Sequence, residues 1–204
     1  MNKAAFLDRD GVINQKAPTE DEYITRWEEM QILPGVVEAV SLLNRAGFQV
    51  IIVSNQRCVA KGLLTTIELD SIHQRLCNEL AVLGAQIDGV YYCPHEEQPP
   101  CRCRKPEPGM LFTAADEHHV DLNSSWMIGD SEKDVAAGRS AGCRTARILR
   151  FGATADSNAD VLARSLLEAV QEILRGEQAV ARQEIGAVQS NLREPNGVNG
   201  TRCR

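Results

Sequence analysis

Short apolar runs alternate with amphipathic segments along most of the chain. Runs of three to five apolar residues are typical of strands buried on both faces of a parallel sheet. Segments with an apolar residue every three or four positions indicate helices, and the clearest begins with the capping pair Thr65 and Glu68 and ends at Gly84. The pattern predicts strands over residues 4–7, 49–53, 90–92, 125–128 and 145–149, and helices over 35–46, 65–83, 109–117, from 134 onward, and 160–174.

Such repeated strand and helix units predict an α/β fold with a doubly wound parallel sheet and right-handed crossovers. We expect one domain over residues 1–175. A cap domain is not expected, because the interval from Asp10 to Pro34 is too short for one and the insertion before Lys105 holds little beyond a cysteine-rich loop. Residues 176–204 are polar and predict a mobile C-terminal tail.

Composition narrows the possible partners. The 204-residue chain is 43% hydrophobic and 25% charged, as is ordinary for a globular domain, and its net charge of −6 argues against general nucleic-acid binding. No apolar stretch is long enough for a membrane helix, and the N-terminus lacks a secretory pattern, so we expect a cytoplasmic protein. No separate exposed apolar face is apparent, which favours a monomer.

Candidate chemistry starts at Asp8-Arg9-Asp10-Gly11, directly after the first apolar run. Two carboxylates one residue apart can act as a nucleophile and a general acid, and Gly11 lets the chain turn away. A surface turn is the simpler explanation of these residues taken alone. The second apolar run ends in Ser54-Asn55, Lys105 follows later, and a further run ends in Gly129-Asp130.

A second cluster combines Cys93 and His95 with Cys101 and Cys103. Three thiols and one imidazole match the tetrahedral ligand set of a structural zinc ion. A disulfide is the alternative, but Cys101 and Cys103 are poorly spaced to pair with each other, and a reducing compartment favours a metal. The loop runs into Arg104 and Lys105, so a bound zinc ion would set where the lysine points. The four remaining cysteines are expected to be free thiols.

The order of these elements resembles the haloacid dehalogenase superfamily of phosphohydrolases over residues 1 to about 150. The resemblance implies that Asp8 is the nucleophile and Asp10 the general acid and base, with Ser54 and Lys105 holding the phosphoryl group. It implies a magnesium site formed by Asp8, Asp130 and the backbone carbonyl of Asp10. Asp134 either orients metal-bound water or is an acidic residue of a helix first turn.

Within that superfamily, Leu7 to Asn14 together with the cysteine loop and Arg104-Lys105-Pro106 resemble the heptose bisphosphate phosphatases and the histidinol-phosphate phosphatases. The resemblance implies a small phosphorylated metabolite as substrate, with the C7 phosphate of D-glycero-D-manno-heptose 1,7-bisphosphate favoured over histidinol phosphate or another sugar phosphate. Acidic residues at positions 20–22 would suit the ammonium group of histidinol phosphate. A non-catalytic phosphate-binding module ranks last, because both carboxylates and the lysine are present. Six residues are expected to contact substrate: Arg9, Tyr23, Asn55, Gln56, Arg57 and Arg104.

Two features of the sequence bear on that expectation. Arg57 stands where the heptose enzymes usually have serine, which adds a cation beside the site. Tyr23 either lines the substrate pocket or is an ordinary packed loop aromatic. The histidines His73, His118 and His119 are expected to be exposed structural residues.

Overall fold

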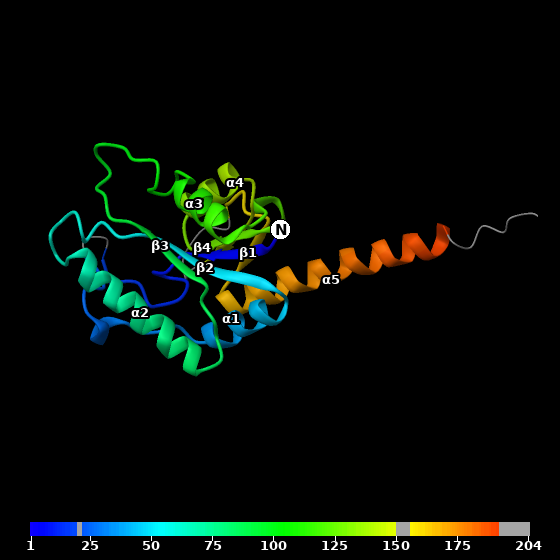
Figure 1. The fold of residues 1–204 in the computed structure, drawn as a ribbon, viewed down its shortest axis with the longest axis horizontal. Coiled ribbons are helices and arrows are strands. Elements are labelled where there is room, and N and C mark those ends of the chain that lie inside the picture. Colours follow the sequence, from blue (N-terminus) through cyan, green and yellow to red (C-terminus); the bar gives the residue numbers. More distant parts are fainter. Residues whose placement is uncertain (20–21, 150–155, 192–204) are drawn as a thin grey trace, which may run out of the picture.

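The computed structural model describes residues 1–19, 22–149 and 156–191. Its centre is a six-stranded parallel sheet with the strand order β3-β2-β1-β4-β5-β6 (Figure 1). The predicted doubly wound α/β fold is confirmed. The strands are β1 (Lys3–Leu7), β2 (Phe48–Asn55), β3 (Gly89–Cys93), β4 (Trp126–Gly129), β5 (Arg144–Ile148) and β6 (Val161–Ala163).

Helices cover both faces of the sheet. They are α1 (Val36–Arg45), α2 (Thr66–Val82), α3 (Gly109–His118), α4 (Glu132–Ala141) and α5 (Leu166–Asn191), with short 3-10 helices η1 (Trp27–Glu29) and η2 (Leu122–Ser124). Helices α1 and α5 pack on the face that carries Ala5 and Leu7 of β1, while α3 and α4 pack on the opposite face, which carries Ala4 and Phe6 (Figure 1). All four of these side chains are fully buried, which explains why β1 is a continuous apolar run.

Side-chain caps determine where two of the helices begin. Thr65 and Glu68 form the predicted capping box of α2, and Ser131 and Asp134 form a second one at α4. Each box satisfies backbone N–H groups that have no partner within the helix, and a good N-cap contributes about 1 kcal/mol. The capping box of α4 also places the Asp134 side chain at the carboxyl end of the sheet.

The C-terminal region differs from the prediction in two respects. Residues 161–163 form strand β6 beside β5, so the helix predicted from 160 begins at Leu166, where the Ser165 hydroxyl accepts a hydrogen bond from the Glu168 backbone. A three-residue apolar strand cannot be told from the start of a helix by periodicity. Helix α5 continues to Asn191 and projects beyond the rest of the molecule (Figure 1). Residues 192–204 of the predicted tail lie outside the described residues.

The strand order creates one crevice. The chain passes from β1 to β2 and β3 on one side, and β4, β5 and β6 extend the sheet on the other, so the carboxyl ends of β1, β2 and β4 meet at a topological switch point. In the described part of the chain, only η1 lies between β1 and α1, and the segment from β3 to α3 has no helix, which agrees with the absence of a cap domain. Among the described helices, none combines the length and apolar character needed to cross a membrane.

Candidate active site

Four chain segments bring together three of the predicted catalytic residues and the predicted metal ligand Asp130. Asp8 follows β1, Ser54 ends β2 with Asn55, and Asp130 follows β4, while Lys105 comes from the loop before α3. These side chains line one cavity of about 520 Å³. The sequence therefore predicted correctly which residues meet at the edge of the sheet.

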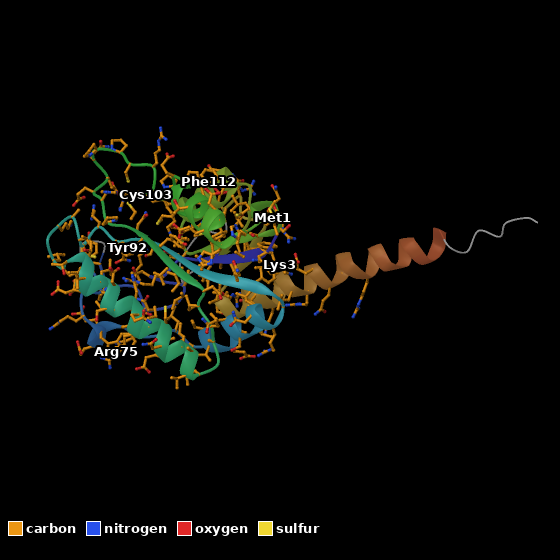
Figure 2. The ribbon with its side chains drawn as sticks, viewed as in Figure 1. Met1, Lys3, Arg75, Tyr92, Cys103 and Phe112 are labelled. Carbon is orange, nitrogen blue, oxygen red and sulfur yellow. The ribbon has the colours of Figure 1, made fainter. Side chains whose placement is uncertain are left out.

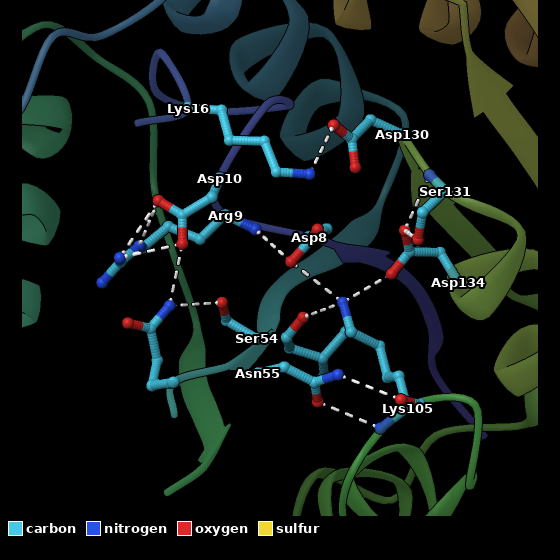
Figure 3. A network of polar contacts seen from close by, with 12 residues as sticks. Asp8, Arg9, Asp10, Lys16, Ser54, Asn55, Lys105, Asp130, Ser131 and Asp134 are labelled. Atoms are coloured by element: carbon cyan, nitrogen blue, oxygen red, sulfur yellow. Dashed lines mark hydrogen bonds and ion pairs between the residues drawn. The ribbon is translucent and has the colours of Figure 1, made fainter. Parts of the chain in front are cut away.

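Lys105 is the centre of the site. Its side chain is 3% exposed, and its ammonium group lies 2.9 Å from Asp8 Oδ1 and 2.6 Å from Asp134 Oδ1 (Figure 3). It also donates a 2.8 Å hydrogen bond to the carbonyl oxygen of Val53 in β2. Burial alone would lower the pKa of Lys105, but Asp134 and Asp8 raise it above its usual value. Lys105 is therefore a fixed cation that contacts two carboxylates and one backbone carbonyl.

Negative charge exceeds positive charge around this lysine. Carboxylate oxygens of Asp8, Asp130 and Asp134 lie within 4.8 Å of one another. Burial raises the pKa of Asp8 to about 7, with further contributions from Asp134 and Asp130 that Lys105 opposes. Three hard oxygen donors held together against their mutual repulsion suit a divalent cation such as Mg²⁺. The residues present therefore fit the magnesium ion that the resemblance implies.

Of the two roles that the sequence left open for Asp134, the structure shows that of an acidic residue in the first turn of a helix, and the orientation of metal-bound water stays a prediction. Its Oδ2 accepts hydrogen bonds from the Ser131 backbone at 3.0 Å and from the Ser131 hydroxyl at 2.6 Å, as an acidic residue in the first turn of a helix does. Its Oδ1 is paired with Lys105. The side chain is 1% exposed, so this carboxylate links the start of α4 to the catalytic lysine.

The Asp10 carboxylate does not face the other three acids. Its oxygens accept from the Arg9 guanidinium at 2.9 to 3.3 Å, from Asn14 Nδ2 at 2.9 Å and from Gln56 Nε2 at 2.9 Å. Burial would raise the pKa of Asp10, but Arg9, Asn14 and Gln56 together bring it below its ordinary value. The metal-ligand role predicted for Asp10 belongs to its backbone carbonyl and remains a prediction.

Arg9 and His73 are both buried, whereas the sequence predicts an exposed His73. The Arg9 side chain is 1% exposed and its guanidinium group binds Asp10, so it acts on the site through Asp10, and the contact with substrate predicted for it stays a prediction. His73 of α2 is 4% exposed, not an exposed residue, and its Nε2 lies 2.9 Å from Arg9 Nη1. A buried Arg9 needs hydrogen-bond acceptors for its guanidinium group, but no sequence pattern identifies His73 as one of them.

The residues at the end of β2 support their neighbours. Asn55 makes a reciprocal pair with the Lys105 backbone, accepting from its N–H and donating to its carbonyl, both at 3.0 Å. Gln56 Nε2 donates to Ser54 Oγ at 2.8 Å as well as to Asp10. Asn55 and Gln56 therefore help to hold the catalytic residues in place, and both also line the cavity.

Four more cations line the cavity: Lys16, whose ammonium group lies 3.4 Å from Asp130 Oδ2, and Arg57, Arg104 and Lys133. Arg57 Nε donates a 2.8 Å hydrogen bond to the Tyr23 hydroxyl. Tyr23 lines the cavity, which agrees with the first of the two predictions made for it. Glu97 lies 3.4 Å from Arg104 and 3.3 Å from Lys133. Lys16, Lys133 and Glu97 were not predicted, because single charges in loops and at helix starts have no distinguishing pattern.

The cysteine cluster is assembled beside this cavity, and Figure 2 labels Cys103 in its loop. The three sulfur atoms are 3.2 to 3.5 Å apart, and His95 Nδ1 lies 3.2 Å from Cys103 and 3.5 Å from Cys93. These separations approach the edges of a tetrahedron with metal–sulfur bonds of about 2.3 Å. None of the described cysteines forms a disulfide, so the alternative of a cross-link within the cluster is wrong and the donor set fits zinc.

Comparison with known proteins agrees with this architecture. The profile of the HAD-hydrolase-like family matches residues 102–169. Relatives at 34% identity or more align with most of the chain and are named as phosphatases. The chain belongs to the haloacid dehalogenase-like family of phosphohydrolases.

Within that family, the similarity is to one group of enzymes. The D-glycero-beta-D-manno-heptose-1,7-bisphosphate 7-phosphatase of Escherichia coli strain K12 is 34% identical over 83% of this chain and 93% of its own, and that of Rhodopseudomonas palustris is 40% identical over 68% of this chain and 79% of its own. The crystal structure of a D,D-heptose 1,7-bisphosphate phosphatase from B. bronchiseptica, complexed with magnesium and phosphate, is 32% identical and superposes with a TM-score of 0.75 over 85% of this chain and 99% of that one.

Proposed function

We propose that this chain is a magnesium-dependent phosphatase that removes the C7 phosphate of D-glycero-β-D-manno-heptose 1,7-bisphosphate. The observation that carries the proposal is the buried cluster of Asp8, Lys105, Asp130 and Asp134 in one cavity. The similarity to heptose bisphosphate phosphatases over most of the chain supports the choice of substrate.

In the first step, a carboxylate oxygen of Asp8 attacks phosphorus, forming an aspartyl-phosphate while the bond to the sugar oxygen breaks. Asp10 acts as the general acid and gives a proton to the leaving oxygen. Because Arg9, Asn14 and Gln56 lower the pKa of Asp10 in the free protein, it must take up that proton as the phosphate dianion binds beside it. Lys105 opposes the rise in the pKa of Asp8 and orients its carboxylate, and the backbone N–H of Arg9 donates to the same Asp8 oxygen at 2.8 Å. A magnesium ion held by Asp8 and Asp130 would offset the charge that otherwise opposes attack on a phosphate dianion.

In the second step, water attacks the phosphorus of the aspartyl-phosphate and transfers a proton to Asp10. This restores the Asp8 carboxylate, releases inorganic phosphate and returns to Asp10 the proton that it gave up in the first step. Ser54 is 1% exposed at the end of β2, and its hydroxyl can donate to a phosphoryl oxygen because its oxygen already accepts from Gln56. The low dielectric of the buried site strengthens these contacts.

The outer cations favour a bisphosphate. Arg57, Arg104 and Lys133 line the cavity outside the cluster of acids, where a second phosphate of the substrate can reach them. Histidinol phosphate carries an ammonium group instead. Of the acidic residues predicted to bind it, Glu22 lines the cavity, and positions 20–21 lie outside the described residues. Cations outnumber Glu22 and Glu97 in this outer region, so the heptose ester is the better match.

The cysteine cluster is proposed to hold one structural zinc ion through Cys93, His95, Cys101 and Cys103. All four zinc positions would be filled by protein, so the ion takes no part in the reaction. It would hold the loop whose next residues are Arg104 and Lys105. The protein is further proposed to act as a cytoplasmic monomer.

The test is phosphate release from a substrate panel. Purified protein with magnesium is assayed on heptose bisphosphate, histidinol phosphate and simple sugar monophosphates. We expect the highest kcat/KM for the heptose ester and loss of at least about 100-fold in Asp8→Asn on every substrate. A low rank for the heptose ester would reject the substrate. Unchanged turnover in Asp8→Asn would reject catalysis at this site and favour a phosphate-binding module.

A further inference from the structure

The buried guanidinium group of Arg9 is held from two sides. On one side Nε and Nη2 contact the Asp10 carboxylate, and Figure 3 shows this fork against Asp10. On the other side Nη1 lies 2.9 Å from Nε2 of His73, which is 64 residues away in sequence. Asp10 therefore takes its orientation from an arginine that is itself oriented by a histidine on a different element.

The chemistry of this contact identifies the state of the histidine. Arginine can only donate, so Nε2 of His73 must accept, and the imidazole is neutral with its proton on Nδ1. Burial and the neighbouring Arg9 charge lower the pKa of His73 to about 3, which agrees with a neutral ring. Nδ1 is buried and has no hydrogen-bond partner among the described residues. A buried N–H without a partner is destabilising, so packing alone favours an apolar residue at this position.

His73 is well placed to act as a rigid acceptor. It lies on α2, and its ring centroid is 5.5 Å from that of Tyr92 in β3. The Tyr92 hydroxyl donates a 2.8 Å hydrogen bond to Asp70 Oδ1, which lies one turn earlier on α2. Figure 2 labels Tyr92 where β3 passes α2. The ring is thereby held between a strand and its own helix.

We propose that His73 is a positioning residue for Asp10, acting through Arg9. The neutral imidazole accepts from Nη1 and fixes the guanidinium plane, so that the opposite edge presents a fork to Asp10. Without that acceptor the guanidinium group can turn to find another, and the Asp10 carboxylate is then oriented only by Asn14 and Gln56. The inference rests on the proposed function, in which Asp10 protonates the leaving oxygen.

The test compares two leaving groups. A sugar phosphate needs a proton on its leaving oxygen, whereas 4-nitrophenolate leaves without one, and kcat/KM reports the steps up to leaving-group departure. We expect His73→Leu to lower kcat/KM by about 10- to 100-fold for the sugar ester and by less than about threefold for 4-nitrophenyl phosphate. His73→Gln keeps an acceptor near the position of Nε2 and should stay within about threefold of wild type on both substrates.

Two comparisons make the result decisive. Equal losses on both esters in His73→Leu, or the same loss for the sugar ester in His73→Gln, would overturn the proposal and leave a structural role. Asp10→Asn must itself show the selective loss on the sugar ester. If it does not, the proposed role of Asp10 has failed rather than that of His73. Thermal unfolding shows which variants are folded, and His73→Met replaces His73→Leu if the leucine variant is not.

Coupling through Arg9 is tested separately with a double-mutant cycle. If His73 acts only by orienting Arg9, adding His73→Leu to Arg9→Met should cause little further loss on the sugar ester. Additive losses would contradict action through Arg9.

Discussion

Replacing Gly129 with alanine probes how closely the sheet must approach α4. Gly129 is the last residue of β4, immediately before Asp130. A Cβ atom at this position would lie 2.1 Å from the Cβ of Asp134 and 2.4 Å from its Oδ2. Non-bonded carbon atoms need about 3.5 Å, so Asp134 or the strand must move by more than about 1 Å.

The size of the effect follows from what Asp134 holds. Its other oxygen lies 2.6 Å from Lys105, which in turn lies 2.9 Å from Asp8. A shift of about 1 Å therefore disrupts the ion pair that orients the nucleophile, and a misplacement of this size can reduce turnover by about 100-fold. Overpacking a buried position costs about 1 to 3 kcal/mol of folding free energy, so the variant should still fold.

The assay is phosphate release with magnesium in excess, alongside thermal unfolding. Gly47→Ala is the matched control. Gly47 has a φ of 78°, and a Cβ at this position would have nothing within 4 Å, so alanine there costs about 1 kcal/mol of backbone strain without touching the site. We expect both variants to lose stability and only Gly129→Ala to lose activity. More than half of wild-type activity in Gly129→Ala would refute the coupling through Asp134.

Three further outcomes are expected. Cys103→Ser should abolish the binding of one zinc ion per chain and lower activity by loosening the loop before the catalytic lysine. The control Cys77→Ser should retain both the zinc ion and the activity. Zinc retained by the Cys103 variant would contradict the proposed site. The pKa of His73 is about 3 in the folded protein and near 6.5 when unfolded, so its contribution is complete above pH 6.5 and is lost as the pH falls. Relative to His73→Gln, wild type should lose about 1.4 kcal/mol of unfolding free energy between about pH 7.5 and 5.5 in urea titrations, and a constant difference would show that His73 titrates normally. Arg57→Ser should raise KM about tenfold for a bisphosphate but not for a monophosphate, and equal effects on both would remove Arg57 from recognition of the second phosphate.

The sequence was most informative where one local pattern predicted both a secondary-structure element and the position of a functional side chain at its end. Asp8, Ser54 and Asp130 each follow an apolar run, and the carboxyl ends of parallel strands necessarily meet at one edge of the sheet. The cysteine cluster was equally readable, because its four donors lie within eleven residues. The start of α5 carried a usable signal as well, since Ser165 and Glu168 have the spacing of a helix cap.

Side-chain direction could not be predicted in the same way. Arg9 lies between two catalytic acids, and nothing in its neighbours indicates that it turns inward to Asp10 rather than outward to substrate. The contact with His73 depends on how α2 packs beside β3 and the residues that follow β1, which is a property of the tertiary structure. Contacts between residues far apart in sequence produce no periodic pattern. A sequence pattern therefore gives the wrong exposure for polar residues, such as Arg9 and His73, that are buried in contact with each other.

Asp134 shows why a structural role and a role in the site are hard to tell apart from the sequence. As an acidic residue three positions after Ser131, it satisfies an ordinary capping rule, and that explanation is sufficient for its presence in the sequence. Because a carboxylate has two oxygens, the same residue can cap α4 with one and hold Lys105 with the other. The beginning of the helix and the position of the catalytic cation are thus determined by a single side chain, and a change that weakens the cap must also move the charge that orients Asp8.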